Sequence, residues 1–172
     1  ASETLQKELG EPVYAPDGSA VYYSRNVTPG PIFEYAQDST QGTFAIERYD
    51  LATGEVTTAV SGYGGAVRPQ PSPDGKRLAF IRRDKDQTEL WIKDLATGEQ
   101  EMIYGDLDMD MQETWAVHGF YPLIDWTPDG NALVLWAGGK LRRVATDGSG
   151  DSVIPFSVND TRGVADAPHP VI

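Results

Sequence analysis

Short apolar runs, each introduced by the same kind of turn, alternate with polar segments along the chain. The runs are Ala20–Tyr23, Leu78–Ile81 and Ala132–Trp136. Each follows a Pro-Asp-Gly sequence, at Pro16–Gly18, Pro73–Gly75 and Pro128–Gly130. Proline sets the backbone of the first turn residue, and Asp-Gly accommodates the tight reversal after it. Because the runs are continuous rather than alternating, they predict strands that are covered on both faces.

A second type of turn alternates strictly with the first. It appears as Asp-Leu-Ala-Thr-Gly-Glu at 50–55 and at 94–99, and more loosely as Ala-Thr-Asp-Gly-Ser-Gly at 145–150. Strands are predicted before these turns at Phe44–Asp50, Glu89–Asp94 and Lys140–Val144, and after them most clearly at Glu101–Tyr104 and Ser152–Phe156. The unit repeats about every 55 residues, and such a fixed period indicates a repeat architecture.

Four antiparallel strands, repeated at this interval and covered on both faces, predict propeller blades. We therefore expect an all-β fold, a β-propeller segment of about three four-stranded antiparallel blades. The expected blades are residues 11–60, 67–104 and 121–157, followed by an exit segment at 158–172. Three blades do not close a ring, and the end blades would expose apolar faces. The ring is expected to be completed by the rest of a longer chain or by a second copy.

The charge and composition of the chain argue against several classes of function. The net charge is −12 and the isoelectric point is near 4.4, so a nucleic-acid partner is not expected. The absence of cysteine excludes disulfides, thiol nucleophiles and cysteine-based zinc sites. No apolar run approaches the length of a membrane span. The compartment stays open, with a periplasmic or exported bacterial protein as the favoured expectation.

The turn sequences resemble a known repeat. Gln70–Gly75 and Asp125–Gly130 are similar to the turn of the TolB-type propeller, in which Trp-Ser-Pro-Asp-Gly-like residues introduce each apolar strand. A longer match begins at Gln112–Pro122 and continues through Trp126–Gly130 and Trp136–Lys140. That segment resembles the N-terminal propeller of bacterial metal-dependent amidohydrolases.

The amidohydrolase resemblance implies a non-catalytic module of a larger enzyme. The module would serve as a scaffold and as a gate or protein-interaction surface beside a hydrolase barrel. A divalent metal is implied only for that barrel, whose site needs a His-x-His pair. This chain has only His118 and His169 and no such pair, so no cofactor is expected in it.

Two alternatives stay open. One is a free-standing TolB-like protein of the cell envelope that binds a peptide or protein partner. The other is the propeller of a prolyl-oligopeptidase-type serine peptidase, whose Ser-Asp-His triad would lie elsewhere. The chain has no Gly-x-Ser-x-Gly sequence, so it does not itself resemble a serine hydrolase.

Aromatic residues in the connections between blades are the candidates for a binding site. No catalytic residue is expected, but a ligand or partner site is expected at the channel mouth. Its residues are Tyr63, Arg68, Trp115, His118 and Tyr121. Aromatic side chains with polar ends suit a ligand surface. The competing interpretation is that they plug the channel or contact a neighbouring domain.

Two further stretches of the chain are rich in charged residues. Asp106, Asp108 and Asp110, with Glu113, are candidates for a cation site, but the sequence departs from a calcium loop in having no glycine at the sixth position. A solvated acidic loop is favoured there. The mixed-charge stretch Arg82–Asp86 is likewise expected to be a solvated loop.

Overall fold

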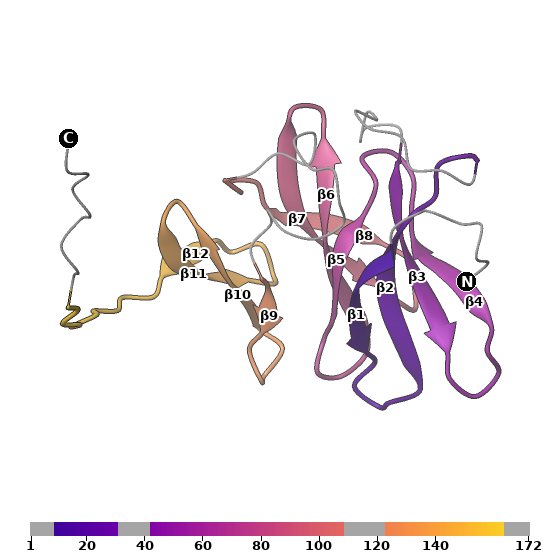
Figure 1. Ribbon diagram of the computed structural model, residues 1–172, viewed down its shortest axis with the longest axis horizontal. Helices are drawn as coiled ribbons and strands as arrows, with labels where there is room; N and C mark the ends of the chain where they lie inside the picture. Colours follow the sequence, from indigo (N-terminus) through magenta and orange to yellow (C-terminus); the bar gives the residue numbers. More distant parts are fainter. Residues whose placement is uncertain (1–8, 31–41, 109–122, 164–172) are drawn as a thin grey trace, which may run out of the picture.

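The computed structural model describes residues 9–30, 42–108 and 123–163, and these form three four-stranded antiparallel sheets with no helix among them (Figure 1). The first sheet contains β1 (Leu9–Tyr14), β2 (Ala20–Asn26), β3 (Phe44–Asp50) and β4 (Val56–Val60). The second contains β5 (Val67–Pro71), β6 (Arg77–Asp84), β7 (Gln87–Asp94) and β8 (Gln100–Tyr104). The third contains β9 (Asp125–Trp126), β10 (Ala132–Ala137), β11 (Lys140–Ala145) and β12 (Asp151–Val153). Neighbouring strands follow one another in the chain, so the predicted all-β propeller segment is confirmed.

The Pro-Asp-Gly turns join the first two strands of every sheet with the same hydrogen bonds. In the second sheet the Gly75 amide donates to the Ser72 carbonyl at 2.8 Å, and the Asp74 carboxylate accepts the Lys76 amide at 3.1 Å. Gly75 has a φ of 69°, a conformation that glycine adopts without strain. The other two turns make equivalent bonds from Gly18 to Ala15, Ser19 to Asp17, Gly130 to Thr127 and Asn131 to Asp129.

The hydrophobic core lies between the sheets. Against the first sheet, Leu78 and Phe80 of β6 pack on Tyr22 and Ile46. Against the third sheet, the cluster contains Ala79, Leu90 and Ile92 from the second sheet with Leu133, Leu135 and Val144 from the third. The second sheet is therefore covered on both faces, and all four residues from Leu78 to Ile81 are fully buried.

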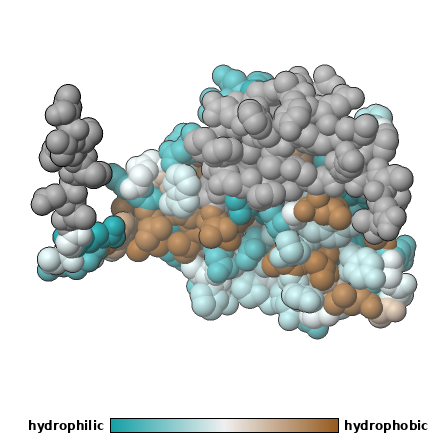
Figure 2. Space-filling view, viewed as in Figure 1, coloured by the Kyte–Doolittle hydropathy of each residue, from teal (hydrophilic) through white to brown (hydrophobic). Residues whose placement is uncertain are grey.

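The first and third sheets each leave one face uncovered by another sheet, at opposite ends of the array (Figure 1). Cross-strand pairing puts Tyr14, Tyr49 and Val56 on the outer face of the first sheet, and all three are exposed. On the outer face of the third sheet, Trp136 pairs with Leu141, and both are exposed. Figure 2 shows a band of hydrophobic residues over the third sheet.

The last strand of each sheet is largely exposed. The first three residues of β4 and of β8 are exposed, and so are all three residues of β12. Between β10 and β11, Gly138 and Gly139 both have positive φ and form the tight hairpin that the sequence predicts. Nothing in the described part of the chain is a helix of the length and hydrophobicity that crossing a membrane requires.

Acid should destabilise the fold through its turn aspartates. The Ser72 hydroxyl and the Lys76 amide lower the pKa of Asp74, and the Ser19 amide lowers that of Asp17. Because each folded-state pKa lies below the unfolded value of about 3.9, the stabilisation is present above that pH and is lost as the pH falls further.

We therefore predict that Asp74→Asn, which keeps an acceptor oxygen but no titratable group, has a shallower loss of stability between about pH 4 and pH 2 than the parent chain. Urea unfolding at a series of pH values measures this loss. Identical acid profiles for the two proteins would contradict the assignment.

Candidate functional site

The first strands of the first two sheets carry the same backbone irregularity. The register of β1 shifts between Gly10 and Val13, and that of β5 shifts between Val67 and Gln70. Within each shift one residue, Glu11 or Arg68, has a φ of 58° and is followed by proline. A non-glycine residue in this region costs on the order of 1–3 kcal/mol, and such strain concentrates at functional sites.

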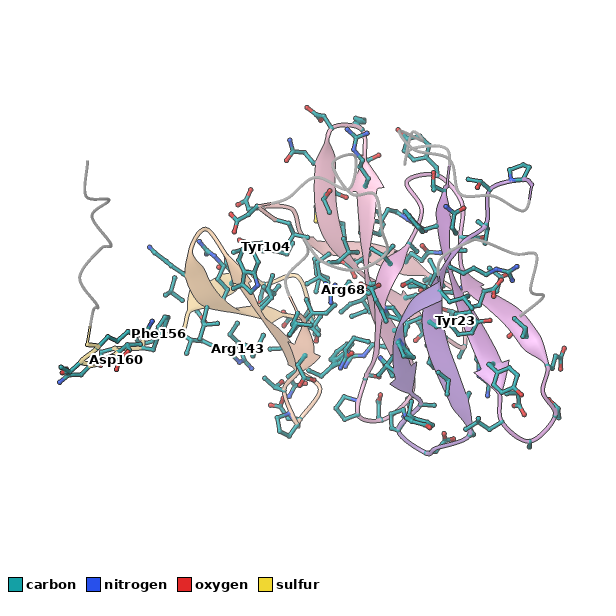
Figure 3. All side chains as sticks on the ribbon, viewed as in Figure 1. Tyr23, Arg68, Tyr104, Arg143, Phe156 and Asp160 are labelled. Atoms are coloured by element: carbon teal, nitrogen blue, oxygen red, sulfur yellow. The ribbon has the colours of Figure 1, made fainter. Side chains whose placement is uncertain are left out.

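Glu11 and Arg68 stand at matching places in their repeats and bind each other. Arg68 Nε lies 3.0 Å from Glu11 Oε1, and the Arg68 amide donates to Glu11 Oε2 at 2.7 Å. The Ser24 hydroxyl donates to the same Oε2 at 2.7 Å. Only 14% of the Arg68 side chain and 7% of the Glu11 side chain are exposed. This buried pair links the first sheet to the second, so Arg68 is already engaged within the fold (Figure 3).

A cavity of about 210 Å³ lies beside this ion pair. Residues from all three repeats line it: Glu11, Pro12 and Val13 from β1, Arg68, Pro69 and Gln70 from β5, and Leu123 and Ile124 immediately before β9. The first strands of the first two sheets and the segment that leads into β9 thus converge on one space, as expected around a propeller channel. Its wall is mainly apolar, with the Glu11–Arg68 pair as its charged part.

Tyr63 lies in the connection between β4 and β5, where its side chain is exposed. The Gly65 amide closes this connection by donating to Gly62 at 3.0 Å, and the Arg83 amide donates to Gly64 at 3.1 Å. A Cβ on Gly64 would lie 1.8 Å from the Arg83 carbonyl oxygen, so only glycine fits there. Tyr63 is thus exposed on a connection that these bonds fix in place, and its role in binding stays a prediction.

Arg82 does not lie in a solvated loop, contrary to the expectation for the stretch from Arg82 to Asp86. It belongs to β6, where its guanidinium donates to the carbonyls of Gly65 at 3.0 Å and Ser61 at 3.1 Å. It also lies over the rings of Phe80 and Trp91. Burial lowers the pKa of Arg82. The sequence pattern of mixed charges does not indicate these contacts, because the acceptors are the backbone carbonyls of Gly65 and Ser61 in another segment.

Most of the remaining candidates lie outside the described residues. These are Trp115, His118, Tyr121, Asp110 and Glu113, and their roles stay predictions. Asp108 is described, and its carboxylate accepts the Gly138 amide at 2.9 Å. Within the described ranges, no group of three carboxylate or imidazole side chains is placed to hold a metal ion.

No family model matches the chain. Dipeptidyl-peptidase 5 of Porphyromonas gingivalis is 26% identical over 130 residues, which are 72% of this chain and 17% of that protein. The uncharacterized peptidase YuxL of Bacillus subtilis is 29% identical over 126 residues, which are 73% of this chain and 16% of that protein. The chain therefore spans about a sixth of the length of these curated relatives.

The structural comparison supports the fold. TolB from Acinetobacter baumannii superimposes with a TM-score of 0.65 at 22% identity, over 87% of this chain and 33% of TolB. At that identity the likeness shows the architecture alone. The structural neighbours are TolB-like β-propellers, as the turn sequences indicate.

The buried ion pair yields a stability prediction. Arg68→Ala leaves the Glu11 carboxylate buried beside Ser24 without its cation, so we expect a loss of about 3–5 kcal/mol in the free energy of unfolding. The matched control is Arg162→Ala, because the Arg162–Asp160 pair is exposed, and it should change the stability by less than about 1 kcal/mol. Urea unfolding of both variants measures the difference, and equal losses would show that the Glu11–Arg68 pair is not structural.

Proposed function

We propose that this chain is a non-catalytic propeller portion of a larger bacterial hydrolase, serving as a scaffold and as a gate or interaction surface. The observation that carries the proposal is the pair of open sheet faces, each with exposed apolar residues. An apolar sheet face is stable when another layer covers it. The proposal therefore requires further propeller blades, supplied by the same polypeptide or by a second copy.

Comparison between repeats supports the requirement for a covering blade. Ile81 and Trp136 both follow the turn glycine of their sheet by six residues. Ile81 is fully buried, and its cross-strand partner Leu90 lies in the cluster shared with the third sheet, whereas 42% of Trp136 is exposed. Its cross-strand partner Leu141 is 37% exposed. The third sheet thus carries large apolar residues where the second sheet is covered by a neighbour.

The sequence relatives favour a peptidase as the parent enzyme. Both curated relatives are named as peptidases, and the aligned portion is a small share of each. We infer a prolyl-oligopeptidase-type serine peptidase, with its Ser-Asp-His triad in another part of the polypeptide. In that enzyme the propeller would limit which substrates reach the triad.

A metal-dependent amidohydrolase is the second candidate. The similarity of residues 112–122 and of the third repeat to the propellers of such enzymes favours it. Its metal would be bound by a barrel in another part of the polypeptide.

The two enzyme classes differ in their response to inhibitors. On the complete polypeptide, a serine-directed fluorophosphonate should label and inactivate the peptidase, whereas a chelator should inactivate the amidohydrolase. Hydrolase activity that resists both reagents would contradict both classes. If the natural polypeptide has no hydrolase domain, the free-standing TolB-like binding protein is the remaining alternative.

A separate experiment tests whether a further blade covers the outer face of the third sheet. In the 172-residue chain, Trp136→Ala should change the free energy of unfolding by less than about 1 kcal/mol, because the side chain is partly exposed. In the longer polypeptide the same change should cost about 3–5 kcal/mol, because a further blade buries the indole.

The matched control is Leu135→Ala on the covered face of the same strand, where the side chain is 2% exposed. It should cost about 2–5 kcal/mol in both proteins. Urea unfolding of the four variants gives the comparison. A Trp136→Ala loss that is small in both proteins would rule out a covering blade.

A further inference from the structure

Both junctions between neighbouring sheets are built from the same two kinds of face. The leading face of a sheet meets the sheet before it and carries the residues three and five positions after the turn glycine. In the second sheet these are Leu78 and Phe80, which pack against the first sheet. In the third sheet they are Leu133 and Leu135, which pack against the second sheet. The opposite face, here called the trailing face, meets the sheet that follows.

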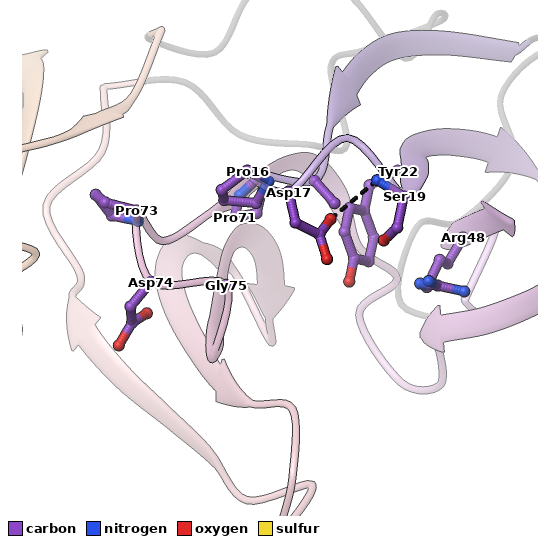
Figure 4. A pocket seen from close by; sticks show the side chains of 10 residues that line it. Pro16, Asp17, Ser19, Tyr22, Arg48, Pro71, Pro73, Asp74 and Gly75 are labelled. Carbon is purple, nitrogen blue, oxygen red and sulfur yellow. Dashed lines mark hydrogen bonds between the residues drawn. The ribbon is translucent and has the colours of Figure 1, made fainter. Parts of the chain in front are cut away.

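Figure 4 shows the first of these junctions from close by. Tyr22 and Arg48 pair across the trailing face of the first sheet, and they line a cavity of about 410 Å³ with Pro16, Pro71 and Gly75. A Cβ on Gly75 would lie 4.0 Å from Pro16, and the next junction repeats this contact at 3.9 Å. The two junctions therefore bring trailing face, leading face and turns together in the same way.

The open leading face of the first sheet repeats the residue pattern of the covered leading face of the second. Both faces present an aliphatic, an aromatic and an arginine side chain at three, five and seven residues after the turn glycine. The first sheet has Val21, Tyr23 and Arg25, and the second has Leu78, Phe80 and Arg82. The first sheet therefore carries the residue types that, in the second sheet, meet a preceding sheet.

The two arginines of this pattern differ in one hydrogen bond. Arg82 Nε donates at 3.0 Å to the carbonyl of Gly65, in the segment that leads out of the first sheet. Arg25 Nη1 lies 3.2 Å from each carboxylate oxygen of Glu47. Arg25 Nε is buried and has no hydrogen-bond partner among the described residues. Because a buried donor without an acceptor is unfavourable, the first sheet lacks a group that the second receives from its neighbour.

The third sheet has the complementary surface, an open trailing face. Val134 and Leu141 stand at the places of Ala79 and Leu90, which pack between the second and third sheets. Trp136, the cross-strand partner of Leu141, is exposed on the same face. Within residues 9–30, 42–108 and 123–163 no sheet follows this face, so its apolar side chains are uncovered.

The segment that leaves the third sheet also lacks the contact that its counterparts make. After β4, the Gly64 carbonyl accepts the Arg83 amide of the second sheet at 3.1 Å. After β8, the Asp108 carboxylate accepts the Gly138 amide of the third sheet at 2.9 Å. After β12, the Phe156 side chain is exposed (Figure 3). The first two exit segments thus bind the sheet that follows, and the third presents an apolar side chain to solvent.

The open faces also complement each other in charge. At the second junction the Arg77 guanidinium lies 4.9 Å from the centre of the Trp126 ring, as in a cation–π contact. Tyr14 stands at the place of Trp126 in the first sheet, four residues before the turn glycine, and is exposed. The open trailing face carries Arg143, which is exposed and forms no hydrogen bond or ion pair with the part of the chain that the structure describes (Figure 3). One face thus offers an uncovered aromatic ring and the other an unpaired cation.

We propose that the trailing face of the third sheet in one copy of this chain binds the leading face of the first sheet in a second copy. Two such contacts close a ring of six blades, within the roughly four to eight that propellers contain. The inference rests on the proposed need for covering blades and names a second copy as their source. Association of separate copies follows mass action, so the dilute chain used for unfolding stays monomeric and the ring forms as the concentration rises.

Sedimentation equilibrium of the 172-residue protein, from about 1 μM to about 1 mM, tests the ring. The mass should rise from that of one chain, 18.8 kDa, to twice that value and stop there, because a closed pair has no open face. A mass that stays at one chain, or that continues past two chains, would overturn the proposal. The covering blade of a longer polypeptide keeps its own test in Trp136→Ala, so the two proposals can fail separately.

Single substitutions show whether unlike faces meet. Trp136→Asp on the trailing face and Tyr14→Asp on the leading face should each raise the Kd of the dimer at least about tenfold, because the contact would bury the new charge. Leu51→Asp is the matched control, since Leu51 is an exposed apolar residue in the turn between β3 and β4, and it should leave the Kd unchanged. Weakening by only one of the two face variants would mean that like faces meet, and the proposal would fail.

Mixing the two face variants provides an independent check. A pair made of one Trp136→Asp copy and one Tyr14→Asp copy keeps one unaltered contact, whereas a pair of identical variants keeps none. The mixture should therefore associate at least about threefold more tightly than either variant alone. Circular dichroism establishes that each variant retains its sheets. Folded variants that associate no better together than apart would contradict the pairing of a trailing face with a leading face.

Discussion

Face-to-face burial of neighbouring sheets is the constraint on which this structure depends. The buried side chains of β6 pack on both sides: Leu78 and Phe80 lie in a cluster shared with the first sheet, and Ala79 lies in one shared with the third. The turns show the same dependence, because Gly75 and Gly130 each lie close to the proline of the preceding turn. A change within one sheet is therefore transmitted first to the sheet beside it, as in other arrays built from repeated units.

Basic side chains hold the sheets together by donating to backbone oxygens of their neighbours. Arg82 and Arg77 do so on either side of the second sheet, and Lys93 Nζ donates to the Ala59 carbonyl at 2.6 Å. The chain has 14 basic residues against 26 acidic ones, so several of its few cations serve internal contacts. Arg68 follows the same principle with a buried carboxylate as its acceptor.

Local patterns were sufficient to predict the sheets, because each turn and its adjoining strands are encoded within a few residues. The inference that all apolar runs are covered on both faces holds for β6, whereas β2 and β10 alternate in burial because their sheets have one open face. The Glu11–Arg68 contact was missed because its partners are 57 positions apart. In the sequence, Glu11 and Arg68 share only that each precedes a proline at the same distance from its turn. The structure is needed to show that both have positive φ and that their side chains form an ion pair. Trp115, His118 and Tyr121 lie outside the described residues, so much of the predicted channel-mouth site stays a prediction.

The exposed outer strands bear on how the chain avoids self-association. An unpaired strand edge invites another chain to add its own strand, and natural sheets counter this with short or charged edges. Here β4 and β8 have five residues each and β12 has three. Glu101 adds a carboxylate to the β8 edge, and Asp151 of β12 pairs with Arg142. Edges this short offer few groups to a second copy that approaches edge to edge, which favours assembly through sheet faces over the growth of a continuous β-ribbon.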